Sequence, residues 1–143
     1  MIEVQLRKRV GITVPGVKKI IARTLQFESV GAPWMAPKRG AINRAPTIGV
    51  LVTGDREIRR INKKFLNHDY ATDVISFGMN DSEYLGDIVV SAGMARRTAK
   101  ELKIPFREEL ARYLIHGTLH LLGYRDKKKK DHERMHERQE EIL

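Results

Sequence analysis

The spacing of apolar residues predicts a strand and then a helix at the start of the chain. Every second residue of the segment IEVQL is apolar, a period that places one face of a strand against a core. The next segment, VPGVKKIIARTLQFESVG, repeats its apolar residues at helical spacing, with Pro15 near its start and Gly31 at its end. Residues 32–46 then lose any period and contain three prolines, which predicts an exposed loop around Trp34.

Three more strands are expected after this loop. Residues 47–55, TIGVLVTGD, read as an apolar strand whose last residue, Asp55, is placed to cap a helix over residues 56–65. The segments TDVISF and GDIVVS are short and rich in β-branched residues, which is typical of strands. Because only a short segment separates them, we expect these two strands to pair with one another.

Three helices complete the pattern. Ser91 is placed to cap the segment AGMARRTAKEL, and Pro105 stands at the start of FREELARYLIHGTLHLLG, where a missing N–H costs nothing. A charged helix is expected from about Lys129 to Ile142. The order βαβαββααα, without internal repeats, predicts a single α+β domain over residues 1–143, with helices packed on a small mixed β-sheet.

Composition narrows the partners and the chemistry. The chain has no cysteine, which excludes disulfides and zinc–thiolate sites, so any transition metal must be held by His, Asp or Glu. Lys and Arg number 27 against 18 Asp and Glu, a formal net charge of +9 that favours a polyanionic partner such as nucleic acid. No run approaches the roughly 18 apolar residues of a membrane span. We therefore expect a cytoplasmic protein without a membrane partner.

Four of the five histidines form two pairs, each with a spacing of four residues that places both imidazoles on one helix face. His132 and His136 match the H-E-x-x-H pattern of metalloproteases. Their surrounding segment, KKKKDHERMHERQEE, is almost wholly charged and offers little to bury. We interpret this match as a chance feature of a solvated helix.

The first pair, His116 and His120, stands in an apolar helix and is followed by a helix stop at Gly123 and a carboxylate at Asp126. The spacing H-x-x-x-H-x-x-G-x-x-D parallels the zinc-binding run of the metzincins, with Asp126 in the place of the third histidine. The pattern predicts a zincin-like metal helix in which His116, His120 and Asp126 hold the ion. His132 is the alternative third ligand.

Gly117 occupies the place of the metzincin general-base glutamate, which argues against peptide hydrolysis by that mechanism. A glycine inside a helix costs about 1 kcal/mol relative to alanine. Its presence therefore predicts that something approaches the helix backbone closely at this point.

These segments resemble the YbeY family over nearly the whole chain. The resemblance rests on INKKF followed by TDVISF, on LGDIVVS, and on EELARYLIHGTLHLLGY, of which the last is the most specific. It implies a single-strand-specific, metal-dependent endoribonuclease that acts in small-subunit ribosomal RNA maturation at the 3′ end and in ribosome quality control. It also implies one Zn²⁺ per chain, metal-ligand roles for His116 and His120, and ribosomal RNA and ribosome or small-subunit assembly proteins as partners.

Two positions depart from the family pattern. Most members read Gly-Tyr-Asp-His where this chain reads Gly-Tyr-Arg-Asp, which places Asp126 at the position of the third histidine. Many members carry an arginine where this chain has Leu66. If that arginine contacts the phosphate, this chain must use another cation or be a weaker nuclease.

Further candidate residues lie near these motifs. The candidates for substrate binding are Lys63, Lys64, Thr72, Asp73 and Arg125. An equal alternative for Thr72 and Asp73 is a structural role at the end of their strand. Asp87 stands in an otherwise apolar strand, where an unpaired carboxylate would be costly. We expect it to support the metal ligands as the partner of a histidine N–H or of a basic side chain.

The leading hypothesis is a zinc endoribonuclease acting on ribosomal RNA. Three protein ligands leave an open position where zinc can lower the pKa of bound water toward 7 and polarise the scissile phosphate. The alternative is a non-catalytic, metal-containing ribosome-assembly factor that binds ribosomal RNA, which Leu66 and Asp126 both favour. A zinc hydrolase of the protease class is disfavoured by the missing glutamate and the basic charge.

Overall fold

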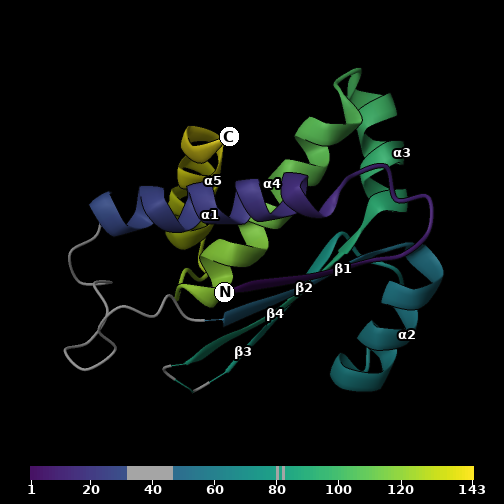
Figure 1. The fold of residues 1–143 in the computed structure, drawn as a ribbon, viewed down its shortest axis with the longest axis horizontal. Coiled ribbons are helices and arrows are strands. Elements are labelled where there is room, and N and C mark those ends of the chain that lie inside the picture. The colour runs from purple at the N-terminus through teal and green to yellow at the C-terminus, as the bar shows by residue number, and fades with distance from the viewer. Residues whose placement is uncertain (32–46, 80, 82) are drawn as a thin grey trace.

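The computed structural model describes residues 1–31, 47–79, 81 and 83–143, so the predicted loop around Trp34 lies outside the described residues. The elements found there follow the predicted order (Figure 1). They are β1 (Ile2–Leu6), α1 (Val14–Gly31), β2 (Thr47–Thr53), α2 (Asp55–Leu66), β3 (Val74–Gly78), β4 (Tyr84–Ser91), α3 (Ala92–Leu102), α4 (Phe106–Leu121) and α5 (Lys129–Ile142). None of the helices in these ranges is long and apolar enough to cross a membrane.

The four strands form one mixed sheet in the order β1-β2-β4-β3. β1, β2 and β4 run parallel, whereas β3 pairs with β4 in the antiparallel direction, with Val74 opposite Val90 and Gly78 opposite Gly86. Parallel neighbours need a long return connection, which α1 and α2 supply, while an antiparallel pair such as β3 and β4 needs only a short one. The predicted α+β class with a small mixed sheet is confirmed.

Helices cover both faces of the sheet, with α1 and α4 on one face and α2 on the other (Figure 1). Successive residues of a strand point to opposite faces, so neighbours on β4 enter different cores. Ile88 packs with Ile21 and Leu114, whereas Val89 packs with Ile58. The α4 face holds the larger core, and α4 also carries the histidines of the first pair.

Gly117 is the point at which α4 approaches the sheet. A Cβ at this position would lie 2.7 Å from a methyl carbon of Ile88 and 3.0 Å from one of Val74. The Ser76 hydroxyl also donates a hydrogen bond of 3.0 Å to the Gly117 carbonyl. The predicted close approach to this glycine is therefore confirmed, and the neighbours are β3 and β4.

The helix ends follow the sequence signals in part. Ser91 caps α3 as predicted, because its hydroxyl accepts a hydrogen bond from the Met94 backbone N–H at 3.1 Å. The prediction that Asp55 caps α2 is wrong, because Gly54 occupies that position without a side-chain bond. Asp55 is the first residue of α2, and its carboxylate accepts hydrogen bonds from Ser91 and Arg97 instead.

A test of the close approach is the substitution Gly117→Ala. Overpacking a tight core contact costs about 1–3 kcal/mol, and the better helix propensity of alanine returns up to about 1 kcal/mol. We expect a lower free energy of unfolding, measured by urea denaturation. Gly78→Ala is the matched control, because a Cβ there would meet nothing within 4 Å. A Gly117→Ala protein more stable than the wild type would contradict the packing described here.

Candidate metal centre

Three candidate ligand atoms converge at the C-terminal end of α4. His116 and His120 lie one helical turn apart, and Gly123, with a φ of 102°, turns the chain so that Asp126 returns toward them. The two Nε2 atoms are 3.1 Å apart. The Asp126 Oδ2 atom lies 3.2 Å from Nε2 of His120 and 3.8 Å from Nε2 of His116. The spacing read from the sequence therefore corresponds to one compact group.

The geometry of this group fits a single divalent metal ion. Zinc binds nitrogen and oxygen at about 2.0–2.2 Å with tetrahedral angles, which separates its ligand atoms by about 3.3 Å. The three measured separations, 3.1, 3.2 and 3.8 Å, span that value. Two imidazoles and one carboxylate also form a donor set that zinc accepts. His132 is exposed on α5 and is not part of this group, which leaves Asp126 as the third candidate ligand.

Hydrogen bonds fix the orientation of both imidazoles. Nδ1 of His120 lies 3.0 Å from the Tyr124 carbonyl, which can only accept, so this nitrogen carries the proton. Nδ1 of His116 lies 3.0 Å from Oε1 of Gln139 and donates in the same way. Each Nε2 is then left without a proton and directs its lone pair toward the other two candidate ligands. Metal-binding histidines are commonly oriented by such a bond from their second nitrogen.

The protonation state of His116 also suits metal binding. Burial, followed by the neighbouring imidazole of His120, lowers the pKa of His116 from its ordinary value. The Gln139 bond and the carboxylates of Asp73 and Asp126 oppose this shift without reversing it. The neutral imidazole, which is the form that binds metals, is therefore favoured at neutral pH.

Two of the residues that hold these imidazoles were missed by the sequence analysis. Gln139 lies on α5, which Met135 and Ile142 anchor against α4. Tyr124 is held by its hydroxyl, which donates to Glu28 at 3.1 Å, and Glu28 is only 2% exposed. A signal for Gln139 was present in the sequence, because it shares a helical stripe with Met135 and Ile142.

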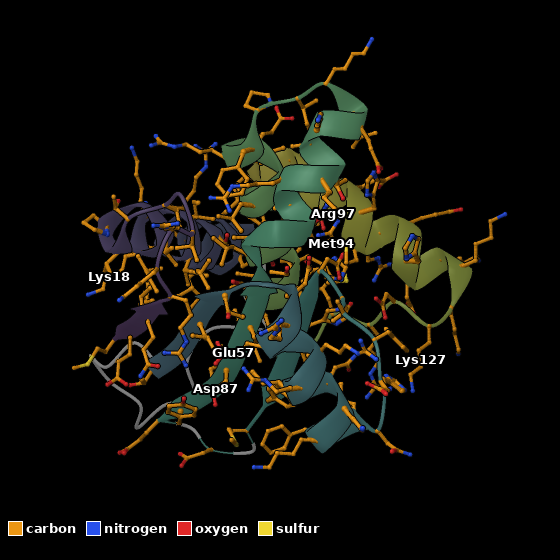
Figure 2. The ribbon with its side chains drawn as sticks, turned by 90° about the vertical axis from the view of Figure 1, so that its right-hand side faces the viewer. Lys18, Glu57, Asp87, Met94, Arg97 and Lys127 are labelled. Carbon is orange, nitrogen blue, oxygen red and sulfur yellow. The ribbon has the colours of Figure 1, made fainter. Side chains whose placement is uncertain are left out.

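The prediction that Asp87 supports the metal ligands is wrong. Asp87 lies on β4 but faces the α2 side of the sheet, where it accepts a hydrogen bond from the Tyr84 hydroxyl. That bond is also the main reason that the pKa of Tyr84 is raised to about 12. Figure 2 shows Asp87 well away from Lys127, the residue after Asp126. Asp87 therefore does not support the imidazoles, and its partner is neither a histidine nor a basic side chain.

The candidate ligands line a hollow of about 650 Å³. Thr72 and Asp73 line it too, and Asp73 also accepts a hydrogen bond of 2.7 Å from the Val74 backbone N–H, so both interpretations of this pair have a structural basis. A second hollow of about 1100 Å³ between α3, α4 and α5 shares Thr72, Asp73 and His116 with the first. We call the two together the trough, and His116 lies where its two halves meet.

The basic residues predicted to bind the substrate lie outside the trough. Lys63 forms a salt bridge of 3.8 Å with Asp69, and the Lys64 ammonium lies 5.3 Å from the ring centre of Phe65. Arg125 lines a separate small hollow, and none of these three residues lines the trough. Lys127, which the sequence analysis did not select, does.

The third ligand can be tested by metal titration. Asp126→Ala removes the only carboxylate of the group, and we expect its zinc affinity to fall by at least about 100-fold, a larger loss than the 10–100-fold typical of residues that only orient a ligand. His132→Ala should bind zinc like the wild type, because His132 is exposed on α5. Both affinities are measured by competition with a chromogenic chelator. A loss in His132→Ala with none in Asp126→Ala would reverse the assignment.

Comparison with known proteins finds relatives that share one description. The family model described as "Endoribonuclease YbeY" matches residues 12–143. An endoribonuclease YbeY of Flavobacterium psychrophilum is 42% identical over 97 residues, which cover 67% of this chain and 69% of the relative. One of Porphyromonas gingivalis is 33% identical over 135 residues, which cover 93% of this chain and 83% of the relative.

A solved structure agrees with the fold. The solution structure of a protein from Thermotoga maritima superposes with a TM-score of 0.61 at 26% sequence identity, over 99% of this chain and 89% of that protein. The match of the family model extends over all three candidate ligands and over every strand except β1. The chain therefore belongs to the endoribonuclease YbeY family.

Proposed function

We propose that the chain is a zinc-dependent endoribonuclease that cleaves single-stranded segments of ribosomal RNA, with a role in small-subunit RNA maturation and ribosome quality control. Family membership supports the endoribonuclease activity itself. The observation that carries the proposal is the convergence of two imidazole nitrogens and one carboxylate oxygen in an open trough. Ribosomal RNA and small-subunit assembly proteins are the proposed partners, and the cytoplasm is the proposed location.

The trough suits a substrate that extends past the metal ligands on both sides. Its two halves meet at His116, so a strand can lie along both while one phosphate stands next to the ligands. His116, His120 and Asp126 would hold the metal ion, which would supply a Lewis acid to that phosphate. Thr72 and Asp73 line both halves and would provide hydrogen-bonding groups to the sugar beside it. The net charge of +9 favours such a polyanionic substrate.

A second candidate is a ribosome-assembly factor that binds ribosomal RNA without cleaving it. Leu66 favours this candidate, because it lines the trough where many family members carry an arginine. An aliphatic side chain cannot neutralise the charge that develops on a phosphate during cleavage. A peptidase is disfavoured, because Gly117 has no side chain to act as the general base.

Cleavage of purified ribosomal RNA distinguishes these candidates. We expect zinc-loaded wild type and His132→Ala to cleave it, and His120→Ala to lose at least about 100-fold in rate, since the metal contributes several kcal/mol of charge stabilisation. His132→Ala is the matched control, because it removes an exposed imidazole outside the candidate group. Circular dichroism shows whether each variant is folded.

Two outcomes would contradict the proposed nuclease activity. Equal cleavage by all three proteins would indicate a contaminating enzyme. Binding of the RNA without cleavage by the zinc-loaded wild type would leave the assembly factor as the better account.

A further inference from the structure

Two aromatic rings stand at the rim of the trough, on the loop between α2 and β3. The rings of His68 and Tyr70 are stacked, with centres 5.3 Å apart and an angle of 11° between their planes. Both residues line the same hollow as His116, His120 and Asp126. Tyr70 is 56% exposed although it is a large aromatic residue. An exposed, ordered ring beside a candidate catalytic group offers a flat apolar surface to a substrate.

The backbone of this loop is fixed by α2. Asn67 ends α2 in the left-handed conformation, with φ 58°, and its N–H bonds to the Lys63 carbonyl at 3.1 Å. The side chain of Asn62, which is 2% exposed, donates to the Tyr70 carbonyl at 3.0 Å. Asp69 accepts a hydrogen bond of 2.9 Å from Arg59. The rings are thus presented by an anchored loop, so little conformational freedom remains to be lost when a ligand stacks on them.

A cation lines the same hollow from the segment that follows α4. Among the described residues that line it, Lys127 is the single lysine or arginine. Figure 2 shows this side chain beside the loop between α2 and β3. It forms no salt bridge with any residue that the structure describes, whereas Lys63 and Arg112 are each paired with a carboxylate. Its ammonium group is therefore available to an anion.

We propose that the His68–Tyr70 stack and Lys127 form a subsite for one unpaired nucleotide of the RNA substrate. The base stacks on the open face of the aromatic pair, and Lys127 contacts a phosphate next to that base. This assignment rests on the proposed function, because it takes RNA as the ligand of the trough. It also supplies the cation that Leu66 does not, from a different part of the fold.

The subsite would give the protein a preference for single-stranded RNA, because stacking requires an unpaired base. A base can lie flat on an aromatic ring only when one of its faces is free, and in a duplex both faces are covered by neighbouring base pairs. Every base has such a face, so the subsite selects unpaired nucleotides without selecting a sequence. The backbone phosphate adds affinity that depends on salt.

The test is binding of a fluorescent, unstructured 12-nucleotide RNA to the full chain in chelator, where cleavage is suppressed. Base stacking contributes about 5- to 150-fold in affinity, so we expect Tyr70→Ala to bind the single strand more weakly by that factor. Tyr70→Phe should bind like the wild type, since it retains the ring. The same RNA in a duplex should bind wild type and Tyr70→Ala equally.

Lys127 is tested by the salt dependence of the same binding. Lys127→Gln should lower the slope of log affinity against log salt by about 1, as expected for the loss of one phosphate contact. Lys130→Gln is the control, because it removes the same charge from an exposed position on α5 outside the trough. An equal effect of both substitutions would show that Lys127 acts only through the net charge and would overturn its role.

Different results of the binding and cleavage measurements would overturn the proposed subsite and the proposed nuclease activity. If zinc-loaded wild type cleaves RNA while Tyr70→Ala binds and cleaves the single strand equally well, the subsite is overturned and the nuclease stands. If the single strand binds with the expected dependence on Tyr70 but zinc-loaded protein cleaves nothing, the subsite stands and the nuclease is overturned. Absence of single-strand binding by the wild type overturns the subsite.

Discussion

The contact between α4 and the β3–β4 pair at Gly117 sets the position of the candidate metal centre. The helix lies so close to the sheet that methyl groups of Ile88 and Val74 occupy the space of a side chain. His116 and His120, which flank this contact on the same helix, are thereby fixed relative to β3 and to Thr72 and Asp73 before it. Gly117 lowers the stability of the helix, but its lack of a side chain permits the close contact that positions the site.

The imidazoles then depend on groups that come from distant parts of the chain. Gln139 on α5 orients His116, while the Tyr124 carbonyl orients His120. Tyr124 is itself tied to Glu28 on α1, a buried carboxylate that also accepts a hydrogen bond of 2.6 Å from Arg138. Such a network holds each ring in one orientation and one tautomer, which is the preorganisation that a metal centre requires. Helices α1, α4 and α5 therefore act together on the site.

The sequence predicts the parts of this site that follow from local geometry. His116, His120 and Asp126 lie within one helix and the turn after it, so helical spacing and the conformation of Gly123 are enough to place them together. The order of the elements is likewise local, because it depends on periods, prolines and caps. The predicted helix cap at Asp55 failed for the opposite reason. Its carboxylate accepts hydrogen bonds from Ser91 and from Arg97 of α3, a contact between distant segments that a local capping pattern does not contain.

What the sequence does not predict depends on which face of an element a residue occupies. Asp87 was misplaced because Ile88, Val89 and Val90 on β4 are all buried, so the strand has no polar face to show where the carboxylate points. Lys63 and Arg125 were selected for closeness in sequence, whereas Lys127 reaches the trough because of the turn after Gly123. These contacts between distant segments become visible only in the folded chain.

Binding of one metal ion by His116, His120 and Asp126 can be measured by X-ray absorption at the zinc edge. For the full chain loaded with one equivalent of zinc, we expect about four nitrogen or oxygen neighbours at about 2.0–2.1 Å, with the outer scattering of two imidazoles. A shell of about six oxygens without imidazole scattering would mean that zinc binds elsewhere on the surface, and these three residues would then not form the metal centre.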